Sequence, residues 1–257
     1  MQARQRDRRQ YFNELATTSR KFYLPYLSSF MRLGEGTNVL EIGCGEGGNL
    51  LPFAQAGCDV TGVDMAPGKI RDAERFFSEE GAEGRFLASD IFAVRELEGQ
   101  FDLILCHDVI EHISDKEEFM RRVRRYLRPE GLAFFAFPAW QMPFGGHQQM
   151  CRNKTLSHLP FFHLLPRGLY RRVLEHGGES PECVSELLEI KQTATPVELF
   201  AKIVRRQGFT VVDRRLWLIN PHYEVKFGLK PRPLPGFIGA VPWVRNFFTT
   251  SCFYLLK

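Results

Sequence analysis

The stretch VLEIGCGEGG, residues 39–48, decides the fold of this chain. Its first half is an apolar run typical of a buried strand, and its second half is a glycine-rich turn before a segment with helical spacing at 49–56. Glycines let the backbone bend sharply there and lie against a ligand that a Cβ atom would displace. The stretch therefore predicts a strand, a ligand-binding turn and a helix, in that order.

Outward from this turn, short apolar runs alternate with longer amphipathic ones as far as residue 138. Such alternation is typical of βαβ units around a parallel sheet. Ser114 is a candidate N-cap for the helix that follows it. The expected strands are 38–42, 59–63, 84–88, 101–106 and 132–137, and the expected helices are 49–56, 68–80 and 115–127.

The pattern changes after residue 138. Residues 139–195 are rich in Pro, His, Gly and aromatic side chains and read as an insertion, after which 196–207 has helical spacing. We expect strands at 209–219 and 223–229, antiparallel because only Asn220-Pro221 separates them. The chain is thus predicted to be α/β, doubly wound, with a seven-stranded, mostly parallel sheet and an antiparallel last strand.

Composition supports one compact domain of this kind. The chain has 257 residues, of which 44% are hydrophobic and 25% charged, so fibrous and disordered classes are excluded. Six scattered cysteines without C-x-x-C spacing favour reduced thiols over disulfides or a zinc site, and the polar, basic start is not a secretory signal. Both observations favour the cytoplasm.

Charge is distributed unevenly along the chain. Lys and Arg outnumber Asp and Glu by 7 to 2 in residues 1–32 and by 16 to 8 in 141–257, whereas the middle, 33–140, is acidic with 11 against 20. Basic flanks suit an anionic substrate, a membrane surface or nucleic acid, and they also suit plain solvation. The apolar tail 236–257 is interpreted as a docked terminal helix, with a membrane-interface contact as the alternative.

The ligand of the glycine turn has two candidate classes. Gly43, Gly45 and Gly48, with Asp64 further on, fit the G-x-G-x-x-G fingerprint of dinucleotide-binding proteins. Glu41 in the strand, together with a second acid in the turn, would repel a pyrophosphate and favour a cationic ligand. The acids thus favour a ligand that carries positive charge.

Four further motifs follow in order and give the chain its resemblance to a known family. Residues 41–47 resemble the E/D-x-G-x-G-x-G signature of class I S-adenosylmethionine-dependent methyltransferases, and 60–65 resemble their second strand, which ends in an acid. The family's third strand, fourth strand and turn into strand five are matched by 87–91, 101–113 and 127–132. The resemblance implies a Rossmann-like fold, methyl transfer and S-adenosylmethionine as cofactor.

That resemblance also implies which residues hold the cofactor. The acid and turn surround the cationic end, Asp64 accepts the ribose hydroxyls with Met65 beside it, and Asp90 with Ile91 receives the adenine. His107 and Asp108 follow strand four and should face the same crevice. The cofactor-binding residues expected at the turn are Glu41, Gly43, Cys44, Gly45 and Gly47.

The same reading divides the chain into four parts. Residues 33–138 and 196–235 form the cofactor-binding domain, and 139–195 form a lid that binds the acceptor. An N-terminal helical segment, 1–32, and the apolar segment 236–257 flank them. Lid aromatics such as Trp140 and Tyr170 could make apolar walls, and its arginines could hold a carboxylate or phosphate.

Methyl transfer needs little machinery beyond alignment and a base for a weak nucleophile. We assign the base to His147, which follows a glycine pair after strand five, and name His107 as the second catalytic candidate. A structural, hydrogen-bonded loop histidine is the alternative. Asp108, Glu111 and His112 form a run that resembles ubiquinone-pathway catechol O-methyltransferases, some of which use magnesium, but we assign no metal.

The sequence thus favours methylation of a small molecule, with an oxygen as the methylated atom. The acceptor could be anionic or linked to a lipid or glycan, and neither its identity nor the oligomeric state follows from the sequence. An NAD(P)-dependent oxidoreductase and an RNA or protein methyltransferase are the alternatives. A nucleic-acid partner is not expected, because no base-flipping signature or RNA-binding module accompanies the basic flanks.

Overall fold

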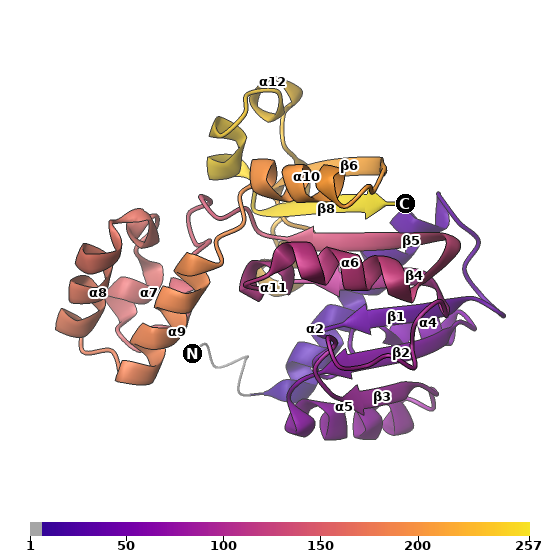
Figure 1. The fold of residues 1–257 in the computed structure, drawn as a ribbon. Coiled ribbons are helices and arrows are strands. Elements are labelled where there is room, and N and C mark those ends of the chain that lie inside the picture. The colour runs from indigo at the N-terminus through magenta and orange to yellow at the C-terminus, as the bar shows by residue number, and fades with distance from the viewer. Residues whose placement is uncertain (1–6) are drawn as a thin grey trace.

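A twisted sheet forms the centre of the molecule, which a computed structural model describes for residues 7–257. Its strand order is β3-β2-β1-β4-β5-β8-β6-β7, and pairing is parallel from β3 through β5 (Figure 1). This order confirms the predicted doubly wound α/β fold. The strands are β1 (Asn38–Ile42), β2 (Asp59–Asp64), β3 (Arg85–Ala88), β4 (Phe101–His107), β5 (Leu127–Phe137), β6 (Val211–Ile219), β7 (Arg232–Pro233) and β8 (Ser251–Leu256).

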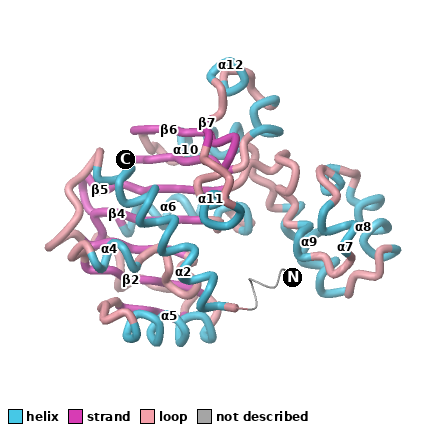
Figure 2. Tube along the Cα trace, turned by 180° about the vertical axis from the view of Figure 1, so that it is seen from behind, coloured by secondary structure: helices cyan, strands magenta, loops and turns pink. Residues whose placement is uncertain are grey.

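Helices cover both faces of the sheet, which is why most side chains of its central strands are apolar. Figures 1 and 2, seen from opposite sides, show α6 and α10 over one face of the sheet. They show α2 (Arg8–Thr18) and α4 over the other face. Each face packs its own cluster of buried side chains. The helices of these layers are α4 (Leu51–Gln55), α5 (Pro67–Glu79), α6 (Lys116–Tyr126) and α10 (Val197–Arg206).

Most strands and long helices predicted up to residue 219 are found close to their expected bounds, but β5 begins at Leu127, five residues before its expected start. The N-cap of α6 is Asp115 rather than Ser114, since its side chain accepts from the Glu118 amide. The predicted helix at 49–56 is shorter, because the glycine turn continues to Leu50.

Two predictions at the end of the chain are wrong. Residues expected to form a strand at 223–229 form a helix, α11 (His222–Phe227). The antiparallel partner of β6 is instead β8, Ser251–Leu256, which lies between β5 and β6 within the tail predicted to be a helix. The antiparallel strand exists as expected, but it comes from a different segment, and the two-residue β7 brings the sheet to eight strands.

The N-terminal segment is helical over its described part, as predicted, and the first six residues lie outside that part. It runs through α2 (Arg8–Thr18), a π-helical turn (Ser19–Tyr23) and α3 (Leu24–Ser28). Phe12, Tyr23 and Leu27 are buried in the core against one face of the sheet. The segment therefore builds part of the core rather than extending from it.

Residues 139–195 form a helical lobe beside the carboxyl edge of the sheet (Figure 1). Its helices are α7 (Lys154–His158), α8 (Arg167–His176) and α9 (Pro181–Gln192). Phe162 and Tyr170, two of the aromatic side chains expected to make acceptor walls, pack instead into the lobe's own core. The lobe is thus a separately packed unit.

The tail before β8 protrudes from the molecule at α12 (Gly236–Gly239), and a 3₁₀ turn (Val244–Phe248) follows (Figure 1). Among residues 7–257, no helix has both the length and the apolar character needed to cross a bilayer.

Candidate active site

The glycine turn after β1 adopts the geometry that only glycine takes without strain. Gly43, Gly45 and Gly47 have φ values of +71°, +54° and +82°. A Cβ atom on Gly43 would lie 2.3 Å from Cγ2 of Val109, so that glycine is also required by the chain's own packing. At Gly45 a Cβ atom would meet nothing within 4 Å, so this residue leaves open space at the turn.

Glu41 lies under this turn with its carboxyl group buried. Its side chain is 1% exposed, and Oε1 accepts a hydrogen bond of 2.8 Å from Nδ2 of Asn49. Oε2 is buried and has no hydrogen-bond partner among the described residues. Burial raises the pKa of Glu41 to about 8. The site therefore holds one carboxylate oxygen that lacks a partner, which an incoming cation or N–H group could satisfy.

Asp64 ends β2 beside the turn. Its Oδ2 accepts from the amide of Gly45 at 3.0 Å and its Oδ1 from the amide of Ala66 at 2.9 Å. The carboxylate of Asp64 thus already accepts hydrogen bonds from two backbone amides. It keeps further lone pairs for the ribose hydroxyls of a ligand. Met65 is 74% exposed, and its apolar side chain has no cover in the described chain.

The predicted adenine residues lie one strand further out. Asp64 is in register with Ala88 of β3, so Asp90 follows the neighbouring strand end. Asp90 is exposed, and its Oδ1 accepts from the Phe92 amide at 2.9 Å. Ile91 is buried in the core, as is the side chain of Cys44, which leaves only the backbone of Cys44 at the turn.

His107 and Asp108 lie where β4 ends. The His107 ring packs against Tyr23 with centroids 5.7 Å apart, and its Nε2 lies 3.6 Å from Oδ2 of Asp108. Asp108 has φ +52°, an uncommon conformation for a residue with a side chain, and its amide donates to the Ala136 carbonyl. Strain of this kind clusters at functional sites.

Glu111, His112 and His147 form a compact group, with one ligand-type atom of each lying within 4.8 Å of the others. Nε2 of His147 lies 4.0 Å from Oε1 of Glu111, and the two imidazole rings are 5.0 Å apart and nearly perpendicular. Both oxygens of the buried Glu111 lack a hydrogen-bond partner among the described residues. The third member of the alternative metal run, Asp108, is not in this group.

The electrostatics of this group favour neutral side chains. Burial lowers the pKa of His147 to about 4, and burial with the nearby Asp108 charge raises the pKa of Glu111 well above its ordinary value. Lys116 donates to the carbonyls of Ile113 and Thr193, and burial lowers its pKa to about 8. A neutral imidazole is the form that accepts a proton.

Two further histidines, His163 and His158, serve the lobe's own structure. His163 is fully buried, with Nε2 bonded to the Trp140 carbonyl at 2.9 Å. His158 is exposed at the end of α7, with Nδ1 2.8 Å from the Lys154 carbonyl. Neither belongs to the group around His147.

Three tyrosines near Asp108 were not predicted from the sequence. Tyr11 and Tyr23 come from the N-terminal segment and Tyr223 from α11, and burial with the negative charge of Asp108 raises the pKa of each. The hydroxyl of Tyr23 is buried without a hydrogen-bond partner among the described residues. The sequence predicts a helical segment at 1–32, but no local pattern shows that its helix lies over the glycine turn.

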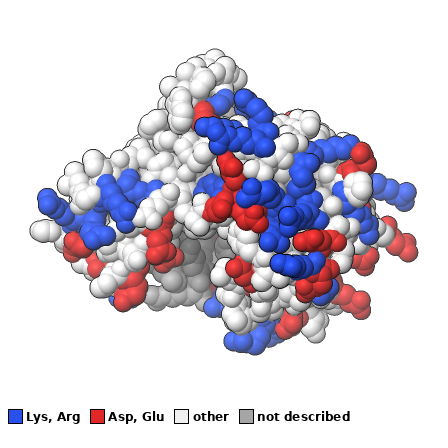
Figure 3. All heavy atoms as spheres, in the orientation of Figure 1, with Lys and Arg blue, Asp and Glu red and all other residues white. Residues whose placement is uncertain are grey.

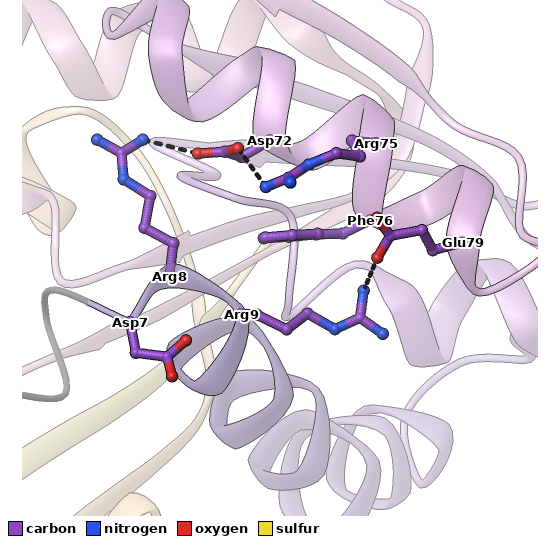
Figure 4. A pocket seen from close by; sticks show the side chains of 7 residues that line it. All are labelled: Asp7, Arg8, Arg9, Asp72, Arg75, Phe76 and Glu79. Atoms are coloured by element: carbon purple, nitrogen blue, oxygen red, sulfur yellow. Dashed lines mark hydrogen bonds and ion pairs between the residues drawn. The ribbon is translucent and has the colours of Figure 1, made fainter.

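That placement is visible in the packing. A Cβ atom on Gly48 would lie 2.5 Å from the Phe12 carbonyl oxygen, so α2 rests directly on the turn. A hollow of about 660 Å³ opens where α2 starts against α5 (Figure 4). Its arginines are already paired with acids, Arg8 with Asp72 at 2.9 Å and Arg9 with Glu79 at 2.8 Å. The hollow is thus a web of surface ion pairs, and none of its lining residues belongs to the His147 group.

The class I methyltransferase fold is defined by three features together: the glycine turn, the acid at the end of the second strand and the strand order of the sheet. Enzymes with this fold use S-adenosylmethionine as the methyl donor. A family model described as "Methyltransferase domain" matches residues 39–131. The chain accordingly carries a class I S-adenosylmethionine-dependent methyltransferase domain, related to O-methyltransferases of ubiquinone biosynthesis.

Among the relatives is the ubiquinone biosynthesis O-methyltransferase of Methylobacterium nodulans, 37% identical over 102 residues, which are 40% of this chain and 41% of the relative. The chain thus matches about two fifths of that relative's length. A methyltransferase of Clostridium acetobutylicum has the same fold with a TM-score of 0.58 at 13% identity, covering 94% of this chain and 91% of that one. Magnesium protoporphyrin IX methyltransferase of Synechocystis gives 0.56 at 15% identity, covering 96% and 85%.

Proposed function

We propose that this protein transfers the sulfonium methyl group of S-adenosylmethionine to an oxygen of a small molecule. The observation that carries the proposal is the buried Glu41 carboxyl, whose Oε2 has no partner, beneath a turn left open at Gly45. A carboxylate held there attracts the positive charge of the donor, whereas the diphosphate of a dinucleotide would meet a second buried acid, Glu46.

The donor's remaining parts would lie along neighbouring strand ends. Asp64 is held by the Gly45 amide and has lone pairs for the ribose hydroxyls, and Asp90 stands at the next strand end for the adenine amino group. Met65 would lose its exposure against the nucleoside. These placements follow the resemblance, residue by residue, and the local geometry is compatible with each.

The chemical step is an in-line displacement. The C–S bond of the donor breaks as a C–O bond to the acceptor forms, S-adenosylhomocysteine leaves, and the hydroxyl proton of the acceptor passes to His147. The neutral imidazole of His147 takes this proton on a ring nitrogen, and Asp108 supplies the negative charge that favours the resulting imidazolium. Glu111 and His112 act as positioning residues.

The acceptor enters from the side of the helical lobe, since His147 lies in the first part of that lobe, shortly after β5. Arg167 and Arg171 line a second hollow of about 480 Å³ between α8 and α9, together with several acids. Because cationic and acidic side chains alternate there, this hollow favours no single charge. The basic excess of residues 141–257 supports an anionic or amphipathic acceptor.

The tail supports a membrane surface as the place where an amphipathic acceptor is met. Among residues 7–257, eight of the sixteen exposed large hydrophobic side chains lie in residues 227–248, with Phe237 78% and Trp243 58% exposed. Residues 225–250 carry four cationic side chains and no acid, which suits anionic lipid headgroups. Figure 3 shows the protrusion at the top of the molecule as largely uncharged on that face.

Hydrogen bonds hold the protrusion in place, so it differs from a loose apolar loop. Oε1 of Glu198 accepts from the Trp243 amide and from Nε of Arg245, both at 2.9 Å, and Oε2 accepts from Nδ2 of Asn246 at 2.6 Å. The buried Asn246 in turn accepts from the Val197 amide at 2.8 Å. A built framework that displays apolar side chains to solvent is typical of a docking surface.

Calorimetry tests the donor assignment. The free protein should bind S-adenosylmethionine and S-adenosylhomocysteine at one site, and NADH should neither bind nor compete. Preferential binding of NADH would overturn the proposal in favour of an oxidoreductase. Once binding is established, methyl transfer from labelled donor to a panel of phenols, carboxylates and lipid-linked alcohols identifies the acceptor.

A further inference from the structure

The helical lobe contains a second group of metal-ligand side chains, which shares no residue with the His147 group. Cys151, Glu179 and Cys183 place one sulfur or oxygen atom each within 4.8 Å of the others. Cys151 and Glu179 are buried, and Cys183 is partly exposed at the start of α9. Two thiols and a carboxylate at this spacing are a ligand set suited to zinc, which prefers sulfur and accepts oxygen.

The carboxylate is fixed by the backbone before any ion arrives. Oε2 of Glu179 accepts from the Arg152 amide at 3.0 Å and Oε1 from the Asn153 amide at 2.9 Å. Each oxygen keeps a second lone pair, so these hydrogen bonds orient the group without exhausting it. Outer contacts of this kind are what hold metal ligands in place.

The cluster also balances the charge of a divalent ion. Its ligands are one carboxylate and two thiols, and an ordinary cysteine thiol carries its proton at pH 7. A divalent ion that replaced both protons would leave the net charge of the buried group unchanged, so it adds no uncompensated charge to the interior.

The lobe has a physical reason to use such a link. Its core is small, built from nine buried residues, and is separate from the two clusters of the sheet. Small units of this kind often need a metal or a disulfide in addition to a hydrophobic core. An ion bound here would join the loop at Cys151 to the first turn of α9.

We propose that Cys151, Glu179 and Cys183 bind one zinc ion that stabilises the helical lobe. The fourth position is open toward the exposed side of Cys183 and is taken by water. Cysteine spacing in the sequence disfavoured a zinc site because these ligands come from segments 32 residues apart rather than from a C-x-x-C pair.

The test is metal titration of the reduced full chain. Cobalt(II) should bind with one-to-one stoichiometry and give the near-ultraviolet charge-transfer band of a thiolate complex, and zinc should displace it. Cys183→Ser and Cys151→Ser should each abolish the band, whereas Cys58→Ser, which alters a buried cysteine outside the cluster, should retain it. The variant His147→Ala should also retain it, which separates this site from the histidine group.

A second measurement on the unaltered protein keeps the test independent of variant folding. Zinc binds thiolates, and an ordinary cysteine thiol is protonated at pH 7, so zinc binding should release close to two protons as both thiols ionise. Zinc should also raise the unfolding temperature. Absence of the thiolate band, a band that survives Cys183→Ser, or zinc binding without proton release would each overturn the proposal.

Discussion

Nε2 of His147 lies 4.0 Å from the buried Oε1 of Glu111, although the two residues are 36 positions apart in the sequence. One belongs to the turn after β4 and the other to the loop after β5, so the pair exists only because these strands are neighbours. The sequence alone presents His147 as an ordinary loop histidine, whereas the nearby Glu111 gives its ring a defined orientation. This orientation leads to the first prediction.

His147→Ala should lower kcat by about 10²–10⁴-fold, the usual contribution of a general base, with little change in donor affinity. Turnover and calorimetry on the same preparation measure both quantities. His158→Ala, at an exposed position on α7, is the matched control and should leave kcat unaltered. An undiminished rate in the His147 variant would remove this residue from the mechanism.

The pH dependence of kcat at saturating donor gives a separate check, because donor binding itself depends on the ionisation of Glu41. Burial lowers the pKa of His147 to about 4, so its imidazole is neutral and able to accept a proton throughout the range above that value. The rate should therefore hold as pH falls through 6.5, where an ordinary histidine would become protonated, and decline only nearer pH 4. A loss of half the activity near pH 6.5 would show that a different group is the base.

Glu41→Gln should stabilise the donor-free fold at pH 8 and abolish donor binding. The pKa of Glu41 is about 8 in the fold and 4.5 ordinarily, so the unfolded chain ionises first and stability is lost as pH rises from about 4.5 to 8. Glutamine keeps the acceptor for Asn49 and removes this loss, on the order of a few kcal/mol.

Thermal unfolding at pH 5 and pH 8 measures the effect of this substitution. The difference between the variant and the natural chain should be larger at pH 8. Glu74→Gln, on the exposed side of α5, should show no such pH-dependent difference. A variant that binds the donor as well as the natural chain does would contradict the role given to Glu41.

Gly48→Ala should destabilise the fold by about 1–3 kcal/mol, because the added Cβ would lie 2.5 Å from the Phe12 carbonyl and 2.8 Å from the Leu15 side chain. Donor affinity should fall with it, since α2 is displaced from the turn. Gly168→Ala, in α8 with open space around the new atom, is the control and should be neutral or slightly stabilising. Equal stability of the two variants in denaturant would refute the proposed packing.

The tail predicts binding to vesicles. Sedimentation with anionic liposomes should retain the natural chain at low salt and release most of the Phe237→Ser, Trp243→Ser double variant. Leu169→Ser, on an exposed position of α8, controls for general loss of apolar surface. Neutral vesicles should bind less protein than anionic ones, and equal binding by the double variant would exclude the tail as the contact.

The sequence predicted the parallel half of the sheet well, since each strand there is flanked by a turn and an amphipathic helix. It failed at β8, because Ser251–Leu256 is a six-residue apolar run buried along its whole length, and a run of this kind has no period to separate strand from helix. Its place between β5 and β6 depends on partners far away in the chain. The segment of α11 failed for the related reason that tertiary packing overrode β-propensity.

The candidate site was likewise predictable only in part. Glu41, the glycines and Asp64 are close in sequence or follow adjacent strands, so their proximity could be predicted from the fold class. The approach of His147 to Glu111, and of Tyr11 to Asp108, depends on loop and helix packing that no local motif encodes. The acceptor side of the site was therefore the part that sequence reasoning left least defined.

The separate core of the helical lobe has one more consequence. Since its buried side chains do not interleave with those beneath the sheet, the lobe could be exchanged for another of similar attachment without rebuilding the half that binds the donor. Chimeras that keep the natural chain through His147 and graft foreign segments between it and α10 should retain donor affinity while changing which molecules they modify. Substrate choice in this chain would then be a modular property, set by one replaceable piece.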